Sequence, residues 1–167
     1  MADGVKSDPF RGFKFRVDII GFEGRAGFQK VSGLKEATEV VEYREGTDKV
    51  TVDKLPGLTT YDNVTLERGL ADGKHFRDWR EQVVKIQQSG NKAPDGTLQP
   101  LVAETGFRRE VTITLVDKGG REVKQWVLAE AWPCGLEYSD FDAMSSDVIV
   151  ETLELCHEGI TEAVPSN

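Results

Sequence analysis

The fold is decided by FQKVSGLKEATEVVEYREGTDKVTVDKLPGLTTYDNVTLERG, residues 28–69. Side chains alternate in two runs, 36–45 and 61–68, which predicts two β-strands. The connection between them, residues 46–60, is too long for a tight hairpin turn, and connections of this length are usually functional or disordered. We therefore expect an arm over 46–60 that reaches out of the domain, with a possible short strand at 50–52.

Short motifs in this stretch and at both ends of the chain occur together in one known family. They are DPFRGFKFRVDI at 8–19, VSGL at 31–34, EYREG at 42–46, KLPG at 54–57, NVTLERG at 63–69, AWP at 131–133 and ETLELCHEG at 151–159. In this order they resemble the tail-tube family, which forms the inner tube of contractile phage tails and of phage-tail-like injection systems. Each motif is short, but their shared order over most of the chain makes the resemblance specific.

Length and composition favour a single globular domain. The chain has 167 residues, of which 38% are hydrophobic and 30% charged, a balance typical of folded proteins. A chain of this length buries roughly two-thirds of its unfolded surface, enough for a core without disulfides. We expect one tail-tube domain over 1–167, with a flexible tail at 1–8, a surface loop at 89–106 and a loose tail at 160–167.

The net charge of −8 limits the partners that the surface can attract. Nucleic-acid-binding surfaces are basic and anionic membranes attract basic segments, so neither kind of binding is expected of the free subunit. The N-terminus lacks the apolar segment of a signal peptide, and no run approaches the roughly 20 apolar residues of a membrane span. We therefore expect assembly in the cytoplasm. Because like-charged copies repel, self-assembly should depend on salt.

Alternating runs and turn signals elsewhere predict a mainly β protein. Residues 13–20 alternate apolar and polar side chains, as in a strand with one buried face. Further strands are predicted over 27–32, 108–117, 122–131 and 148–157. With the two runs around the arm, this gives seven or eight strands joined largely by hairpins.

The strand predicted over 122–131 presents two different sides. Trp126 and Leu128 belong to a bulky side that should fill the core, and Ala129 and Ala131 belong to a small side. The small side would permit close approach of a neighbouring subunit. Pro133 is expected to close the strand, because proline cannot donate to a ladder.

One helix is predicted over 74–88. Phe76, Trp79, Val83 and Ile86 recur at helical spacing on one side, and the opposite side is charged. Such a helix packs over a sheet, with Trp79 as a core anchor. The predicted fold class is therefore a mainly β, antiparallel sandwich or barrel with one flanking helix.

No constellation of catalytic or metal-binding residues is apparent. His75 and His157 are the only histidines, and Cys156 and His157 are neighbours that point to opposite faces of a strand. With Cys134, the cysteines are too few for a disulfide framework and are expected to be free thiols. Phosphate-binding and nucleophile-elbow motifs do not occur. We expect no enzyme activity, no cofactor and no metal.

Glu151 is the acidic residue that the pattern predicts to be buried. It follows the apolar alternation of its strand, with Leu153 and Leu155 on the same face. A buried carboxylate needs a partner. The candidates are Arg44, Arg68 and Arg109.

The resemblance implies a structural function. Tail-tube proteins, whose architecture the haemolysin-coregulated proteins share, form homohexameric rings that stack head to tail into a hollow tube. A contracting sheath drives this tube through a target envelope. The implied partners are other copies of the chain, the sheath protein, baseplate or tube-initiating proteins, and a DNA or protein-effector cargo in the lumen. The implied location is a phage tail or a phage-tail-like particle.

The resemblance also implies roles for particular residues. Those assigned to the arm between rings are Gly46, Asp48, Lys49, Asp53, Lys54, Leu55, Pro56 and Gly57. Pro56 presets φ and Gly57 permits positive φ, so the KLPG segment is expected to form the turn of the arm's return path. A lumen should be polar so that cargo slides. The lumen candidates are Glu36, Thr38, Glu42, Thr65 and Glu67.

Three other classes stay open. The first is a baseplate or tube-initiating adaptor, which forms one ring but no long tube. The second is a ring or cargo-carrying protein of a type VI-like secretion system. The third is an unrelated monomeric ligand-binding β-barrel or small enzyme. Long tubes, isolated rings and monomers would distinguish these classes by electron microscopy.

Overall fold

A computed structural model describes residues 13–23, 26–44, 46–47, 50–88 and 105–165 of the chain. Within them lie ten β-strands, one α-helix and a short 3-10 helix. In chain order these are β1 (Lys14–Ile19), β2 (Ala26–Phe28), β3 (Lys30–Ser32), β4 (Glu36–Tyr43), β5 (Asp53–Tyr61), β6 (Val64–Gly69), α1 (His75–Gln88), the 3-10 helix (Thr105–Phe107), β7 (Arg109–Val116), β8 (Glu122–Tyr138), β9 (Val150–Cys156) and β10 (Gly159–Ala163). Among the described residues, none of the helices has the length and apolar character needed to cross a bilayer.

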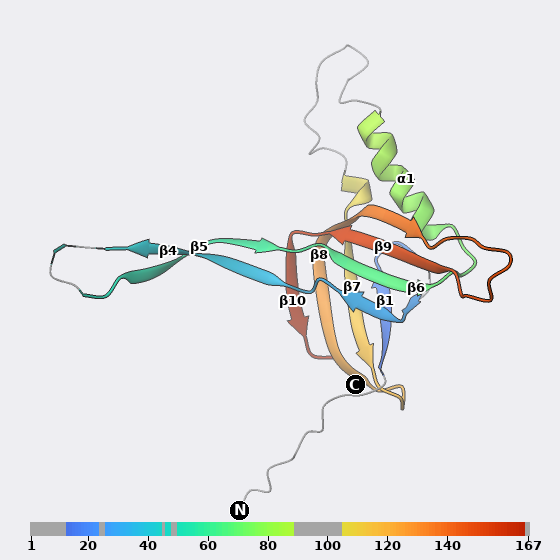
Figure 1. The fold of residues 1–167 in the computed structure, drawn as a ribbon, viewed down its shortest axis with the longest axis horizontal. Helices are drawn as coiled ribbons and strands as arrows, with labels where there is room; N and C mark the ends of the chain where they lie inside the picture. Colours follow the sequence, from blue (N-terminus) through green and yellow to red (C-terminus); the bar gives the residue numbers. More distant parts are fainter. Residues whose placement is uncertain (1–12, 24–25, 45, 48–49, 89–104, 166–167) are drawn as a thin grey trace, which may run out of the picture.

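Most strands belong to one curled antiparallel sheet. Its order is β2-β1-β7-β8-β9-β6-β3, and β10 also pairs with β8. The long β8 joins two halves of this sheet, because its first part pairs with β7 and β10 and its last part pairs with β9. The end strands β2 and β3 follow one another in the chain, separated only by Gln29, so the sheet closes round one core (Figure 1). The predicted mainly β, antiparallel sandwich-or-barrel fold is confirmed.

The core lies between the two halves of this sheet. It takes side chains from the inward face of every long strand of the body, including Val17, Leu66, Ile113, Leu128 and Leu153, none of which is more than 1% exposed. Their alternation with polar neighbours is the period-two signal that predicted the strands. Each buried aliphatic side chain of this size stabilises the fold by about 1.5–3 kcal/mol.

Helix α1 covers the sheet as its pattern predicts. Phe76, Trp79 and Val83 are buried beneath it. The Trp79 indole N–H donates to the carbonyl oxygen of Phe107 over 2.6 Å, so its polar atom is satisfied inside the core. The ring of Phe22 meets Trp79 edge-on at a centroid distance of 5.6 Å. Trp79 is therefore a core residue that fixes the helix to the body.

Strand β8 runs past the residue that was expected to close it. Pro133 lies inside β8 at a bulge before Gly135, and a bulge tolerates proline because regular pairing lapses there. A second bulge includes Glu130, whose φ is 52°, and shifts the alternation by one residue. Ala131 is consequently buried while Ala129 is exposed. The prediction that both alanines line one small outer side is wrong.

The predicted loose tail at 160–167 is wrong for its first residues. β10 pairs along β8 from Ala129 to Gln125, and Ile160 packs against the core. A strand this short, with one packed side chain, shows no alternation in the sequence. The predicted tail at 1–8 and residues 89–104 of the predicted loop lie outside the described residues. The end of that loop forms the 3-10 helix.

A two-stranded ribbon projects from the body (Figure 1). Its strands, β4 and β5, pair only with each other. Ser32 lies opposite Thr65 in the body, and Glu36 lies opposite Tyr61 in the ribbon, four residues further along both strands. The ribbon therefore continues the pairing of β3 with β6 in unchanged register. We call residues 36–61 the arm.

The predicted bounds of the arm, 46–60, are wrong. β5 occupies most of that range, and the run predicted as one strand over 61–68 divides at Asp62 and Asn63 into the end of β5 and the start of β6. The reason is physical: a ribbon without a core of its own needs no clear apolar alternation, so β5 carries no strand signal. The arm is a hairpin that begins ten residues earlier than expected.

Candidate functional site

The arm has two faces that differ in chemistry. Residues opposite each other in an antiparallel pair share a face. One face carries Glu36 and Thr38, and the Thr38 hydroxyl lies 2.9 Å from that of Thr59. The other face carries the cross-strand pair Val41 and Leu55. We call this second face, which carries Val41, Tyr43 and Leu55, the inner face of the arm.

The arm exposes apolar side chains that the described part of the chain leaves uncovered. The exposed fractions are 45% for Val41, 50% for Tyr43 and 50% for Leu55 on the inner face. Val40 (59%), Val50 (99%), Val52 (41%) and Leu58 (69%) add to them. An isolated two-stranded hairpin is at best marginally stable in water, and large exposed apolar patches mark interaction sites. The arm therefore keeps apolar side chains exposed that its own body does not cover.

The KLPG segment does not form the predicted turn. Lys54–Gly57 lies within β5, and positive φ is found at Gly46 but not at Gly57. Glycine favours the close approach of the two strands at 57: a Cβ there would lie 3.0 Å from Val41 Cγ2 and 3.2 Å from the Glu39 carbonyl oxygen, a tight fit. The register shifts by one residue here, which makes a bulge in β5. Of the other predicted arm residues, Asp48 and Lys49 lie outside the described residues.

The root of the arm is held firmly to the body. Gly33 has a φ of +83°, and a Cβ at this position would lie 2.0 Å from the Asn63 carbonyl oxygen. The Lys35 ammonium lies 3.3 Å from the Asp62 carboxylate, and the Asp62 amide donates to the Lys35 carbonyl. The His157 imidazole donates from Nε2 to the Asp62 carbonyl over 2.9 Å. The break between β3 and β4 is therefore a fixed joint.

Both cysteines lie beside this root as free thiols. The Asn63 amide donates to Glu154 over 2.8 Å and accepts from the Cys156 thiol over 3.2 Å. Burial, followed by the hydrogen bond with Cys156, raises the pKa of Cys134 to about 12. Cys134 thus stays protonated at neutral pH and acts as a structural residue.

The five lumen candidates form two groups, two in the body and three in the arm. Thr65 and Glu67 alternate with the buried Val64 and Leu66 of β6 and so face outward. Lys30 pairs with Glu67 over 2.9 Å on this surface. Glu36, Thr38 and Glu42 share one side of β4, beyond the break at Gly33, and Glu36 lines a hollow with Trp126 and Ile160.

Glu151 is buried and paired. Its carboxylate accepts from Arg68 Nε over 2.7 Å, directly across the β6–β9 ladder. The side chains of both residues are largely shielded, with 6% exposure for Glu151 and 14% for Arg68. Arg109 instead donates to the Ile20 carbonyl, and Arg44 lies at the outer end of β4. This ion pair links the neighbouring strands β6 and β9 inside the body.

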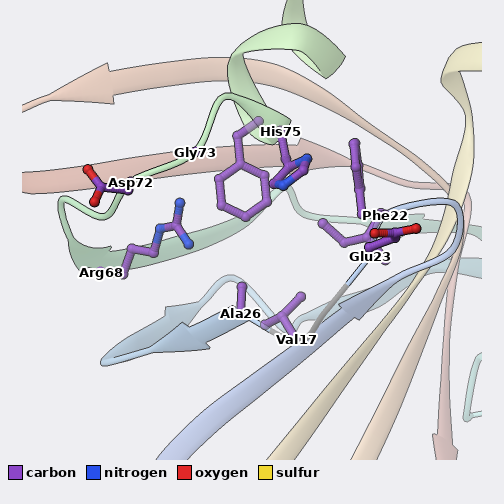
Figure 2. A pocket seen from close by; sticks show the side chains of 10 residues that line it. Val17, Phe22, Glu23, Ala26, Arg68, Asp72, Gly73 and His75 are labelled. Atoms are coloured by element: carbon purple, nitrogen blue, oxygen red, sulfur yellow. The ribbon is translucent and has the colours of Figure 1, made fainter.

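A small cavity opens where β6 leads into α1 (Figure 2). Its volume is about 190 Å³, and its apolar wall includes Val17, Ile19 and Phe76. Arg68 lines it, with its guanidinium carbon 4.4 Å from the centre of the Phe76 ring. Sequence reasoning missed this cavity, because its walls come from two distant segments, 17–26 and 68–76. Within the described residues, no cluster of His, Cys, Asp and Glu has the arrangement of a metal site.

Known proteins agree with this architecture. The family model of the T4-like virus tail tube protein gp19 matches residues 11–161. A chain from the extended sheath–tube complex of an extracellular contractile injection system, PVC, is 25% identical, with a TM-score of 0.69 and coverage of 96% of this chain and 95% of that chain. A chain from the anti-feeding prophage (AFP) baseplate is 24% identical, with a TM-score of 0.66 and coverage of 94% and 97%, and it shows the shared fold.

No curated protein sequence matches the chain. The family match covers most of the chain and includes the arm, its root and the strands of the body. A tail tube protein is a structural component of a phage tail or of a tail-like injection particle, not an enzyme. The chain belongs to the family of the T4-like virus tail tube protein gp19.

Proposed function

We propose that the chain forms homohexameric rings that stack head to tail into the hollow, rigid inner tube of a contractile tail or injection particle. Sheath contraction drives this tube through the target envelope, and DNA or protein effectors pass through the lumen. Membership of the tail tube family supports the tube, and the similarity to a chain of a sheath–tube complex supports a sheath partner. Baseplate proteins initiate the tube.

The inner face of the arm is the observation that carries the proposal. The arm extends a strand pair beyond the core, so Val41, Tyr43 and Leu55 stay about half exposed. Full burial of such side chains contributes about 1.5–3 kcal/mol each, and a lone protomer forgoes part of this stabilisation. A neighbouring copy supplies the missing surface.

The contacts must be heterologous, because the arm of one copy meets a different surface on the next. Heterologous contacts close into rings or continue as filaments, and a tube of stacked rings uses both. The net charge of −8 opposes this association, so the contacts strengthen when salt screens the charge. The edge strands of the body, such as β10, offer unpaired backbone groups to neighbours within a ring.

Polar residues of β4 and β6 supply the lumen wall in this proposal. Glu36, Thr38 and Glu42 share one side of β4, Thr65 and Glu67 share the outward side of β6, and three of the five are acidic. Such a surface repels DNA at short range and offers no apolar patch to a moving protein. It therefore suits a conduit that must not retain its cargo.

Electron microscopy and native mass spectrometry of the purified chain test the proposal, with increasing salt and with the baseplate proteins of its particle as initiators. Six chains of 18.5 kDa give a ring of about 111 kDa. Stacked hollow tubes are the expected result. Isolated rings under every condition would identify an adaptor or a secretion-type ring instead, and monomers alone would overturn the proposal.

A further inference from the structure

The cavity beside α1 has a size and a chemistry that match an aromatic side chain. An engineered protein cavity of about 150 Å³ holds a benzene molecule. The cavity here is somewhat larger, at about 190 Å³, and Val17, Ile19 and Phe76 form the apolar part of its wall. A single six-membered ring therefore fits inside.

The polar groups of the cavity gather at its rim. Glu23, Asp72 and His75 line the cavity (Figure 2) and are exposed, and the guanidinium carbon of Arg68 lies 4.4 Å from the centre of the Phe76 ring. Arg68 carries several N–H donors, of which Nε–H donates a hydrogen bond to Glu151. The carboxylates of Glu23 and Asp72 are acceptors. A phenol is a ring whose hydroxyl both donates and accepts hydrogen bonds. It satisfies this arrangement better than an aliphatic side chain does.

The cavity and the arm lie at opposite ends of β6. The arm joins the body just before Val64, and the cavity lies beyond Gly69, next to Asp72 and Gly73. Six residues of strand separate these ends by roughly 20 Å. An arm and a socket at opposite ends of one body cannot meet within a copy. They meet when copies are arranged head to tail, with the arm of one directed at the far end of the next.

We propose that Tyr43 in the arm of one copy inserts its ring into this cavity of a second copy. Tyr43 is the aromatic residue on the inner face of the arm and is 50% exposed, so it is available for such a contact. Its ring covers Val17 and Phe76, and its hydroxyl meets the carboxylate and guanidinium groups of the rim. The inference rests on the proposed function, since it names the surface that receives the arm.

Crosslinking tests the contact directly. Tyr43→Cys and His75→Cys are combined in one chain in which Cys134→Ser and Cys156→Ser remove the native thiols. Mild oxidation of assembled tubes should join separate chains into a covalent ladder on a non-reducing gel. The matched control pairs Tyr43→Cys with Lys118→Cys, an exposed position in the β7–β8 turn, and should give no ladder.

Ring deletion gives a second readout. Tyr43→Ala should reduce the number of tubes at least about tenfold, since buried tyrosines are common interface hot spots. Tyr43→Phe keeps the ring and should keep most tubes. Ala26→Leu narrows the cavity that receives the ring, so it should reduce tube number as Tyr43→Ala does. Asp72→Ala, at the exposed rim of the cavity, should weaken stacking less.

The outcomes separate the two proposals. Tubes that form normally with Tyr43→Ala, or that give no ladder with the 43/75 pair, would overturn this inference and leave the tube function standing. A ladder as strong with the 43/118 pair would also overturn it. A wild-type chain that never stacks would overturn the proposed function and this inference together.

Discussion

The body and the arm contain two halves of one strand ribbon, and one half packs on the core while the other is exposed to solvent. β3 and β6 pair over the core, and β4 and β5 continue the same register into solvent. Leu66 in the body is fully buried, while Leu55 on the inner face of the arm is 50% exposed. This comparison shows that backbone pairing alone can extend a strand pair past the end of its own core.

The energetics of the arm support the proposed assembly. In the body, burial of Leu66 offsets the entropy of ordering its strand. The arm orders a comparable length of backbone without that gain. The fixed joint at Gly33, Lys35 and Asp62 restrains the arm, and in the proposed tube a neighbouring copy supplies the missing burial.

Removing the arm should abolish tube formation and leave the body folded. Replacing residues 37–60 with Asn-Gly closes the ribbon directly between Glu36 and Tyr61, which face each other. We expect a folded body whose melting temperature changes little, and no stacked tubes. Circular dichroism and electron microscopy measure the two properties. Tubes of normal length from this variant would show that the arm does not connect rings.

Breaking the charged pair of the body should have the next largest effect. Arg68→Ala leaves the Glu151 carboxylate buried without its partner and should lower the free energy of unfolding by about 3–5 kcal/mol. Arg77→Ala, which removes an exposed ion pair with Glu81 in α1, should cost about 0.5 kcal/mol or less. Urea unfolding compares the two variants. Equal, small losses would show that the buried pair is not needed for stability.

Two leucines on one ribbon give the sharpest matched contrast. Leu66→Ala should lower the free energy of unfolding by about 2–5 kcal/mol, because it leaves a cavity in the core. Leu55→Ala should cost the isolated protomer about 0.5 kcal/mol or less, because its side chain is half exposed, yet it should reduce tube formation. Urea unfolding of dispersed protein and tube counts provide both readouts. A large loss of protomer stability from Leu55→Ala would mean that the arm folds back on its own body.

The smallest effect concerns the thiol beside the root of the arm. Burial raises the pKa of Cys134 to about 12, so its alkylation at pH 8 should be at least about 100-fold slower than that of an unfolded cysteine. The folded state holds this proton more tightly than the unfolded state. Its contribution to stability is therefore complete below pH 9 and is lost as pH rises from about 9 to 12. Cys134→Ser should remove this part of the pH dependence, and alkylation as fast as that of the unfolded chain would contradict the buried thiol.

The sequence predicts the body far better than the arm, for a physical reason. β1, β7 and β9 each bury one face, so their alternation is visible, and Trp79 marks the buried side of α1. Burial of Glu151 follows from the same alternation, and its partner, Arg68, is one of the three arginines named as candidates. β5 buries neither face within the protomer, so Pro56 and Gly57 resemble turn residues although they lie in a strand.

Other features depend on positions that a linear pattern does not encode. The bulge at Glu130 places Ala131 in the core and leaves Ala129 exposed. The cavity brings Val17 together with Arg68 and Phe76, two segments that are far apart in the chain and meet only after the sheet closes. The motifs of the family, by contrast, identified the tube protein without any of these details.

Hydrogen exchange of the arm amides, compared between dispersed protomers and assembled tubes, tests the central claim that a neighbouring copy covers the arm. In protomers, peptides from 36–61 should exchange much faster than peptides from β7 and β9, because few buried contacts hold the arm. In tubes the account predicts that arm exchange slows at least about 100-fold and approaches that of the body. Arm peptides that exchange equally fast in protomers and in tubes would contradict it.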